Sequence, residues 1–228
     1  MDKTMNDRGL QLPLYAQVRM ESYVLLASLL GQPPDAGLQK VLKNLEWDEA
    51  VPDQLASSLS ALRTASREYS VEAMQAEFNK LFVGLGSGEI IPYASWYLEK
   101  RIQSRPLAHL RTDLYVLGIV RKGSDHEPED RAAALCEVMA IISNAESPCS
   151  LETQADIFQR HLAGWMGIFF QDLTRAKSAA FYRNVGQFGL HFMEYESQYL
   201  GCNLNGVPLM KRRSSYENRI DRQPAELS

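Results

Sequence analysis

Residues 181–199, FYRNVGQFGLHFMEYESQY, carry the pattern that decides the fold class. Large apolar side chains recur along this stretch in alternating steps of four and three residues, at Phe181, Val185, Phe188, Phe192, Tyr195 and Tyr199. Such steps place all six side chains on one face of an α-helix. The stripe predicts a long helix that packs deep in a bundle of other helices.

The same periodicity extends toward the N-terminus over most of the chain. A first helix is predicted to end at Gly31, because Pro33 and Pro34 follow it. Further apolar stripes run over residues 38–45, 55–62, 74–82, 107–117, 135–142 and 157–169. No pair of segments has the alternation of a strand hairpin. The sequence therefore predicts one all-α domain over residues 1–210, a bundle of roughly eight helices. Residues 211–228 carry no apolar stripe and are predicted to form a disordered, charged tail.

Several helix starts are also expected from the sequence. Ser70 and Ser150 can cap helices, and Pro106 and Pro128 suit the first turn of a helix. The helix after Ser150 is expected to continue through residue 169. Its predicted inner face consists of Ile157, His161, Trp165, Ile168 and Phe169.

The chain is acidic and contains few cysteines. Its 228 residues include 24 Lys and Arg against 28 Asp and Glu, a net charge of −4, and residues 1–210 alone carry −6. Without a basic excess to neutralise phosphates, nucleic acid is not an expected partner. Cys136, Cys149 and Cys202 form no CxxC motif and are odd in number, so reduced thiols are expected.

The apolar runs are too short for a membrane span. The best of them, residues 23–30, stops well below the roughly 18 to 20 residues that a bilayer requires. The opening MDKTMNDRGLQLP mixes both charge signs and lacks the apolar region of a secretory signal. We therefore expect a cytoplasmic protein without stable membrane insertion.

Spacings typical of catalysis or of metal binding are missing from the sequence. The histidines, which are His109, His126, His161 and His191, form no HExxH or similar ligand pattern. No catalytic residue, metal or cofactor is expected. The glycines of residues 84–88, GLGSG, are similar to those of a phosphate loop, but they follow a predicted helix and no Gly-Lys-Ser/Thr closes the loop. An all-α protein that binds or hydrolyses GTP with Gly84–Gly88 is the alternative function.

Residues 77–98, EFNKLFVGLGSGEIIPYASWYL, join the end of an apolar helix to a glycine-rich loop and an aromatic segment. This composition suits a surface that grips another chain. It also suits a buried connection between helices whose aromatic side chains fill the core. The pattern alone leaves both interpretations open.

This stretch resembles the signature of the TorD/DmsD/NarJ family of cytoplasmic molybdoenzyme chaperones, approximately E-x-x-x-L-F-x-G-P-G followed by P-P-Y-x-S-x-Y. The matching residues are Glu77, Leu81, Phe82, Gly84, Gly86, Pro92, Tyr93, Ser95 and Tyr97. Leu85 and Ile91 stand where the family has prolines, so the fixed φ angle of proline is not carried over to these two positions.

Two later segments are also similar to this family. Pro128, Asp130, Leu135, Met139 and Ala140 match a second signature, P-x-D-H followed by an apolar helix. Arg131 replaces the usual histidine, so a role of that histidine is not carried over. The aromatic residues between 158 and 182 resemble the C-terminal helices of the family.

The resemblance implies a chaperone, not an enzyme, that binds the twin-arginine signal peptide of a molybdopterin oxidoreductase subunit. It would hold the apo catalytic subunit until the cofactor is inserted, as a monomer or a dimer with exchanged helices, and GTP would at most bind weakly. The implied peptide-binding residues are Leu81, Phe82, Gly84, Gly86, Pro92, Tyr93, Ser95, Trp96, Tyr97, Asp130 and Arg131. An interaction subunit without peptide selectivity is the third hypothesis.

Overall fold

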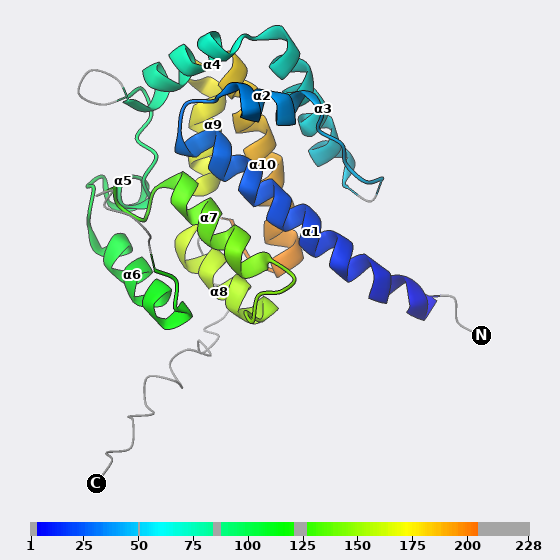
Figure 1. Cartoon of the computed structure of the whole chain (residues 1–228). Helices are drawn as coiled ribbons and strands as arrows, with labels where there is room; N and C mark the ends of the chain where they lie inside the picture. Colours follow the sequence, from blue (N-terminus) through cyan, green and yellow to red (C-terminus); the bar gives the residue numbers. More distant parts are fainter. Residues whose placement is uncertain (1–3, 50, 84–87, 121–126, 205–228) are drawn as a thin grey trace.

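The computed structural model describes residues 4–49, 51–83, 88–120 and 127–204, and side chains from residue 15 onward. Within these residues the chain forms ten α-helices and one π-helical turn (Figure 1). They are α1 (Thr4–Gly31), α2 (Ala36–Lys43), α3 (Asp53–Glu68), α4 (Val71–Phe78), the π-helical turn (Asn79–Val83), α5 (Ala94–Glu99), α6 (Arg105–Leu117), α7 (Ala132–Ser143), α8 (Leu151–His161), α9 (Met166–Arg175) and α10 (Phe181–Leu200). The prediction of an all-α fold is confirmed. The predicted tail, residues 211–228, lies outside the described part.

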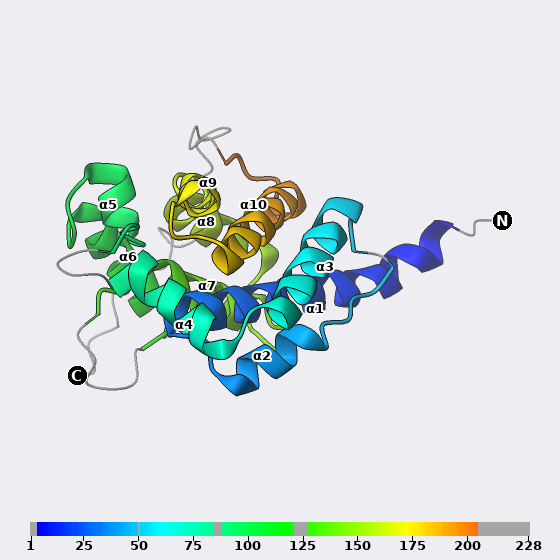
Figure 2. The same ribbon diagram turned by 90° about the horizontal axis from the view of Figure 1, so that it is seen from above.

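Helix α10 is the centre of the bundle, as its stripe predicted. Its four N-terminal stripe residues are fully buried, and Tyr195 and Tyr199 are partly buried. α10 packs against α9 and α3, while α1 packs along α7 (Figure 1). Seen from above, α5 and α6 lie at one end of the molecule and the N-terminal part of α1 at the other (Figure 2).

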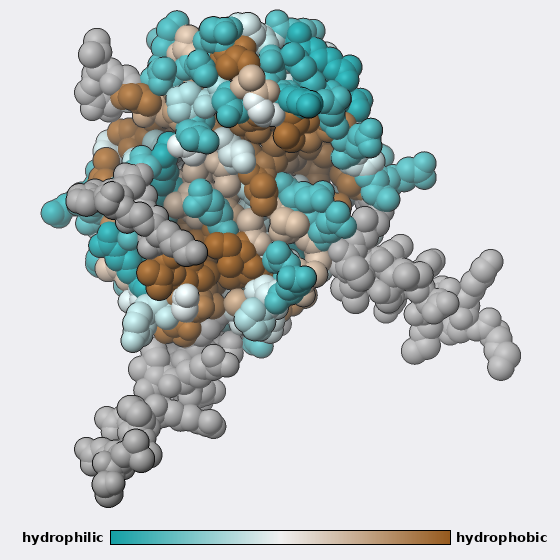
Figure 3. Space-filling model, in the orientation of Figure 1, coloured by the Kyte–Doolittle hydropathy of each residue, from teal (hydrophilic) through white to brown (hydrophobic). Residues whose placement is uncertain are grey.

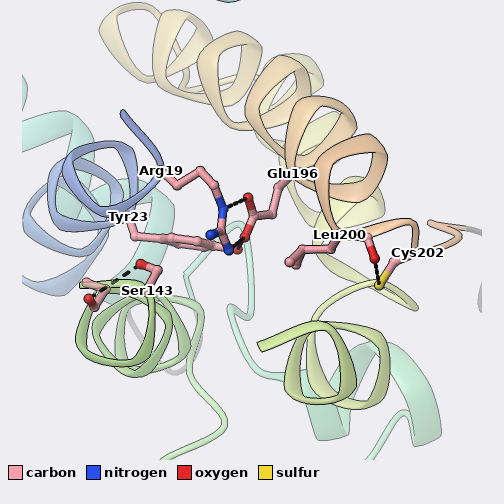
Figure 4. A network of polar contacts seen from close by, with 7 residues as sticks. Arg19, Tyr23, Ser143, Glu196, Leu200 and Cys202 are labelled. Carbon is pink, nitrogen blue, oxygen red and sulfur yellow. Dashed lines mark hydrogen bonds and ion pairs between the residues drawn. The ribbon is translucent and has the colours of Figure 1, made fainter. Parts of the chain in front are cut away.

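A buried ion pair joins the first and last helices. The Arg19 guanidinium donates to both carboxylate oxygens of Glu196, from Nε at 2.6 Å and from Nη2 at 2.7 Å (Figure 4). Tyr23 donates its hydroxyl to the same carboxylate, and Arg19 also lies over the ring of Tyr199. Burial tends to lower the pKa of Arg19, but Glu196 outweighs it and raises that pKa. The Arg19 guanidinium therefore keeps its proton and its positive charge in the buried pair with Glu196.

The structure has two helices more than the roughly eight predicted. The short helix α5 lies in the aromatic segment after the glycine-rich loop, where the sequence predicted no helix. The helix expected over residues 150–169 is broken into α8 and α9, because the chain turns between Leu162 and Trp165. At this turn the Trp165 indole N–H donates to the carbonyl of His161, the last residue of α8. The prediction for Ile168 is wrong as a result: this side chain is 55% exposed, while Phe169 is buried.

The expected helix starts are confirmed at three of four positions. Ser70 and Ser150 each accept a backbone N–H three residues ahead, and Pro106 lies in the first turn of α6. Helix α7, however, begins at Ala132 and not at Pro128. Arg131 is extended instead, because it forms an antiparallel bridge with Tyr93. Among the described residues, no helix combines the length and hydropathy needed to cross a membrane.

Candidate functional site

The two signature segments lie side by side in the structure. Ala94 donates its N–H to the carbonyl of Asp130, and Ala132 donates to the carbonyl of Pro92, both at 2.9 Å. These bonds flank the bridge between Tyr93 and Arg131. Residues 36 to 40 positions apart in the chain therefore form one junction at the starts of α5 and α7.

Asp130 caps helix α5 from outside that helix. Tyr93, at the N-cap position, makes no side-chain cap, whereas Asp130 Oδ2 accepts the Ser95 N–H at 2.8 Å. A carboxylate at this place satisfies a helix N–H that lacks a partner within the helix. Asp130 is 1% exposed and Ser95 is fully buried. Both support the junction from inside.

Arg131 and Tyr93 hold a second carboxylate, Glu127, in place. Arg131 Nη1 lies 2.5 Å from Glu127 Oε2, and its Nη2 donates to the carbonyl of Leu30 at the end of α1. The Tyr93 hydroxyl donates to Glu127 Oε1 at 3.1 Å. Burial and the nearby Glu127 raise the pKa of Tyr93 to about 12, so the phenol keeps its proton. Arg131 thus links α1, α7 and the segment before it.

A groove next to this junction runs between α6 and α7. We call this hollow of about 700 Å³ the α6–α7 groove. Its apolar lining includes Leu114, Tyr115, Ile119, Val120, Val138 and Ile141. Tyr115 is 86% exposed, Val120 80% and Ile141 55%, although all three are large apolar residues. Figure 3 shows apolar side chains gathered on this face beside α7. An exposed apolar patch of this kind marks a binding surface.

Charged side chains line the same groove. Arg111 pairs with Glu129 at 2.8 Å, and Arg131 pairs with Glu127. A fifth charged residue, Glu137, is exposed on α7 and makes no hydrogen bond or ion pair with any described residue. Among the described residues that line it, the groove therefore has one carboxylate in excess.

The outer wall of the groove is anchored from behind. Asp113 on α6 is 6% exposed, and its Oδ2 lies 2.6 Å from His161 Nε2 on α8. Arg160 Nη1 donates to the other carboxylate oxygen at 3.0 Å. This fixes the position of α6, so that Tyr115 on its other face points away from the core.

Tyr97 of α5 lies against α9, and neither aromatic residue of α5 lines the groove. Tyr97 packs on Trp165 with ring centroids 5.4 Å apart, and its hydroxyl donates to Asp172 at 2.9 Å. Burial, and then Asp172, raise the pKa of Tyr97 well above its ordinary value. Trp96 is partly buried, with Lys100 near its ring.

The remaining predicted residues support the fold or lie outside the described residues. Leu81 is fully buried and Pro92 is buried. Phe82 is partly buried and packs on Phe78 and Tyr182. Gly84 and Gly86 belong to residues 84–87, which are not described. Gly88 is packed so closely that a Cβ there would lie 2.3 Å from the carbonyl oxygen of Leu81.

Of the predicted residues that are described, Arg131 alone lines the α6–α7 groove, and Tyr93 reaches it through Glu127. Sequence reasoning missed Tyr115, Val120 and Glu137. Signals for two of them were present. Tyr115 stands off the apolar stripe of α6, and Glu137 is the single charged residue of α7, whereas Val120 lies beyond the end of α6 and had no such signal. Within the part of the chain that is described, no group of His, Cys, Asp and Glu could hold a metal ion.

Comparisons with known proteins point to one family. The family model "Nitrate reductase delta subunit" matches residues 44–171. The chain is 22% identical over 209 residues to the chaperone protein TorD of Vibrio cholerae, covering 83% of this chain and 95% of TorD. It is 27% identical over 181 residues to TorD of Actinobacillus pleuropneumoniae serotype 7, covering 75% and 88%. A crystal structure from Archaeoglobus fulgidus, described as a redox enzyme maturation protein, matches with a TM-score of 0.51 at 18% identity, covering 76% of this chain and 93% of that one.

Proposed function

The chain belongs to the nitrate reductase delta subunit family, whose members are maturation chaperones and not enzymes, and we propose that it binds the twin-arginine signal peptide of a molybdopterin oxidoreductase subunit, its client. It would do so in the cytoplasm and hold the apo-subunit until the cofactor is inserted and export can follow. The proposed site is the α6–α7 groove with the junction that borders it.

The chemistry of the groove suits such a peptide. A twin-arginine signal combines two guanidinium groups with a short apolar stretch. Tyr115, Val120 and Ile141 can take the apolar stretch, because their exposed surface is removed from water on binding. Glu137 can pair with an arginine, since no described residue competes for it. The observation that carries the proposal is the combination of an exposed apolar groove with a carboxylate, that of Glu137, which has no charged partner among the described residues.

The signature residues have positioning roles in this proposal. Arg131 and Tyr93 hold Glu127 at the edge of the groove, and Asp130 fixes the junction behind it. Their substitution would move the groove wall instead of removing a peptide contact. In this proposal the signature residues are buried or hydrogen-bonded because they shape the wall of the groove, while the peptide contacts come from exposed residues beside them.

The test is the affinity of the purified protein for a twin-arginine signal peptide, measured by calorimetry. Ile141→Ala is expected to weaken binding about tenfold or more, as an anchor at an interface does. Ile168→Ala is the matched control, because Ile168 is also an isoleucine with 55% exposure, on α9. Replacing both arginines of the peptide with glutamine should also cause a large loss of affinity. This loss should be smaller for the Glu137→Gln protein, because the variant no longer carries the carboxylate that pairs with an arginine.

Two outcomes would contradict the proposal. Unchanged affinity after loss of both arginines would favour an interaction subunit without peptide selectivity. Weaker binding by Ile168→Ala together with unchanged binding by Ile141→Ala would move the site to the α5–α9 face, where Trp96 and Tyr97 lie.

A further inference from the structure

A second hollow lies on the other side of α1, between α1, α2 and α3. We call this hollow of about 920 Å³ the α1–α3 hollow. Its apolar lining includes Val24, Val41, Leu45, Trp47, Leu59 and Phe188. Val41 is 56% exposed and Val24 46%. Figure 3 shows apolar side chains in a recess between α1 and α3.

The wall of this hollow is held in place by contacts from α3. The Arg63 guanidinium lies 4.7 Å from the centroid of the Trp47 ring, and its Nη1 donates to the carbonyl of Leu45 at 3.0 Å. The segment after α2 is thereby fixed with Trp47 facing the hollow. Because this wall is already ordered before a partner binds, less conformational entropy is lost on binding.

The hollow has a one-sided charge. Among the described residues, its lining contains three carboxylates, Glu21, Glu46 and Asp48, and no lysine or arginine. A second copy of this acidic chain would bring like charges to this rim, whereas a basic partner would be attracted. Charge complementarity therefore selects a partner that combines apolar and basic side chains.

The walls also favour a helical partner. One common mode by which an extended peptide binds is the addition of a strand to a free sheet edge. The part of the chain that is described offers no sheet, only one isolated bridge at Tyr93 and Arg131. A helix instead needs no backbone partner, since its own hydrogen bonds satisfy it, and it can place one apolar stripe into a hollow.

The hollow is continuous with the α6–α7 groove. It shares Val24 and Ser28 with a smaller hollow between α1 and α7, and that hollow shares Glu137 and Ile141 with the groove. From these observations we infer that the α1–α3 hollow docks a basic amphipathic helix of the client subunit, separate from its signal peptide. The inference rests on the proposed function in taking the client as the partner.

The experiment uses two probes with the full chain. One is a synthetic 18-residue helix with leucines on one face and lysines on the other, and the second is the twin-arginine signal peptide. Val41→Glu should weaken binding of the leucine–lysine helix at least tenfold and leave the signal peptide unaffected. Val120→Glu is the matched control in the α6–α7 groove and should show the reverse. Glu21→Lys with Glu46→Lys should weaken the leucine–lysine helix and favour a leucine–glutamate helix.

Trp47 provides an internal signal. Its fluorescence should change when the leucine–lysine helix binds, and Trp47→Phe should abolish this change. Unchanged affinity in Val41→Glu, or complete competition between the two probes, would overturn the inference. So would self-association of the wild type that Val41→Glu abolishes, because a second copy would then occupy the hollow. If the signal peptide fails to bind while the helix binds as described, the proposed function fails and the docking surface stands.

Discussion

Glu77, the first residue of the signature, caps the start of α10. Its Oε1 accepts the N–H groups of Ala180 and Tyr182 at 2.8 and 2.6 Å, and its Oε2 accepts that of Phe181 at 3.0 Å. A carboxylate here satisfies N–H groups that have no partner within the helix and lies at the positive end of its dipole.

We expect Glu77→Ala to lower the free energy of unfolding by about 2–3 kcal/mol, because three backbone donors lose a charged acceptor at a buried site. Urea denaturation measures this. Glu68→Ala is the control, since Glu68 is exposed at the end of α3, and it should change stability by no more than about 0.5 kcal/mol. Equal effects of the two substitutions would refute the capping role.

Glu89 follows the glycine-rich loop of the signature and binds the connection between α9 and α10, close to the residues that Glu77 holds. It accepts the backbone N–H groups of Lys177 and Ser178. Burial tends to raise the pKa of Glu89, but these N–H groups outweigh it and lower that pKa below its ordinary value of 4.5. The stabilisation by Glu89 is therefore present above pH 4.5 and lost as the pH falls through the folded-state pKa.

Glu89→Gln should consequently have a lower thermal midpoint than the wild type at about pH 7, and the difference should shrink as the pH falls below 4.5 through the folded-state pKa of Glu89. Thermal unfolding monitored by circular dichroism on acidification checks the prediction. A difference that does not shrink as the protein is acidified would show that the charge of Glu89 is not what stabilises the connection.

At the scale of the elements, the contact between α9 and α10 depends on glycine. A Cβ on Gly189 would lie 2.3 Å from the ring of Phe170, which is fully buried on α9. The absence of a side chain lets the two helices approach closely. Gly167, in α9, faces open space instead, and a Cβ there would have no neighbouring atom within 4 Å.

Gly189→Ala is expected to destabilise the protein by about 1–3 kcal/mol, because overpacking against Phe170 outweighs the better helix propensity of alanine. Gly167→Ala, the matched control, should be neutral or stabilising by up to about 1 kcal/mol. Chemical denaturation of both variants tests the pair. A stabilised Gly189→Ala variant would mean that α9 and α10 can move apart at little cost.

At the scale of the whole molecule, the buried pair of Arg19 and Glu196 closes the bundle. It joins residues 177 positions apart, and their side chains are 2% and 0% exposed. Removing either partner leaves a buried charge alone, which typically costs about 3–5 kcal/mol.

We expect Glu196→Leu to destabilise the protein by this amount, and Arg19→Met with Glu196→Leu to recover most of the loss. A double-mutant cycle in urea measures the coupling. The exposed pair of Arg105 and Glu99 is the control and should contribute less than about 1 kcal/mol. Additive losses at Arg19 and Glu196 would contradict their direct coupling.

Local patterns predicted most helices but not all of them. Stripes of three- and four-residue steps identified the core face of α10, and serines marked the starts of α4 and α8. Helix α5 has only six residues, too few for a repeat, and its start depends on Asp130, a residue from another segment. The break between α8 and α9 was missed because apolar side chains continue on both sides of it.

The signatures identified two residues of the junction that borders the candidate site, Arg131 and Tyr93, but not the groove itself. The exposed walls of the groove at Tyr115 and Ile141 come from different helices. Whether Tyr97 of α5 fills the core or faces a partner depends on Trp165 and Phe169, which pack against it.

The sequence by itself determined the all-α class, the family and the positions of most helices, because each follows from interactions between residues three or four positions apart or from a contiguous signature. The tertiary structure alone decided that Glu77 and Asp130 cap helices to which they do not belong, that Arg131 reaches the end of α1, and that a groove opens between α6 and α7 in which Glu137 has no charged partner among the described residues. The physical reason is range: hydrogen bonds and burial between distant segments depend on how the helices pack, and a one-dimensional pattern does not contain that packing.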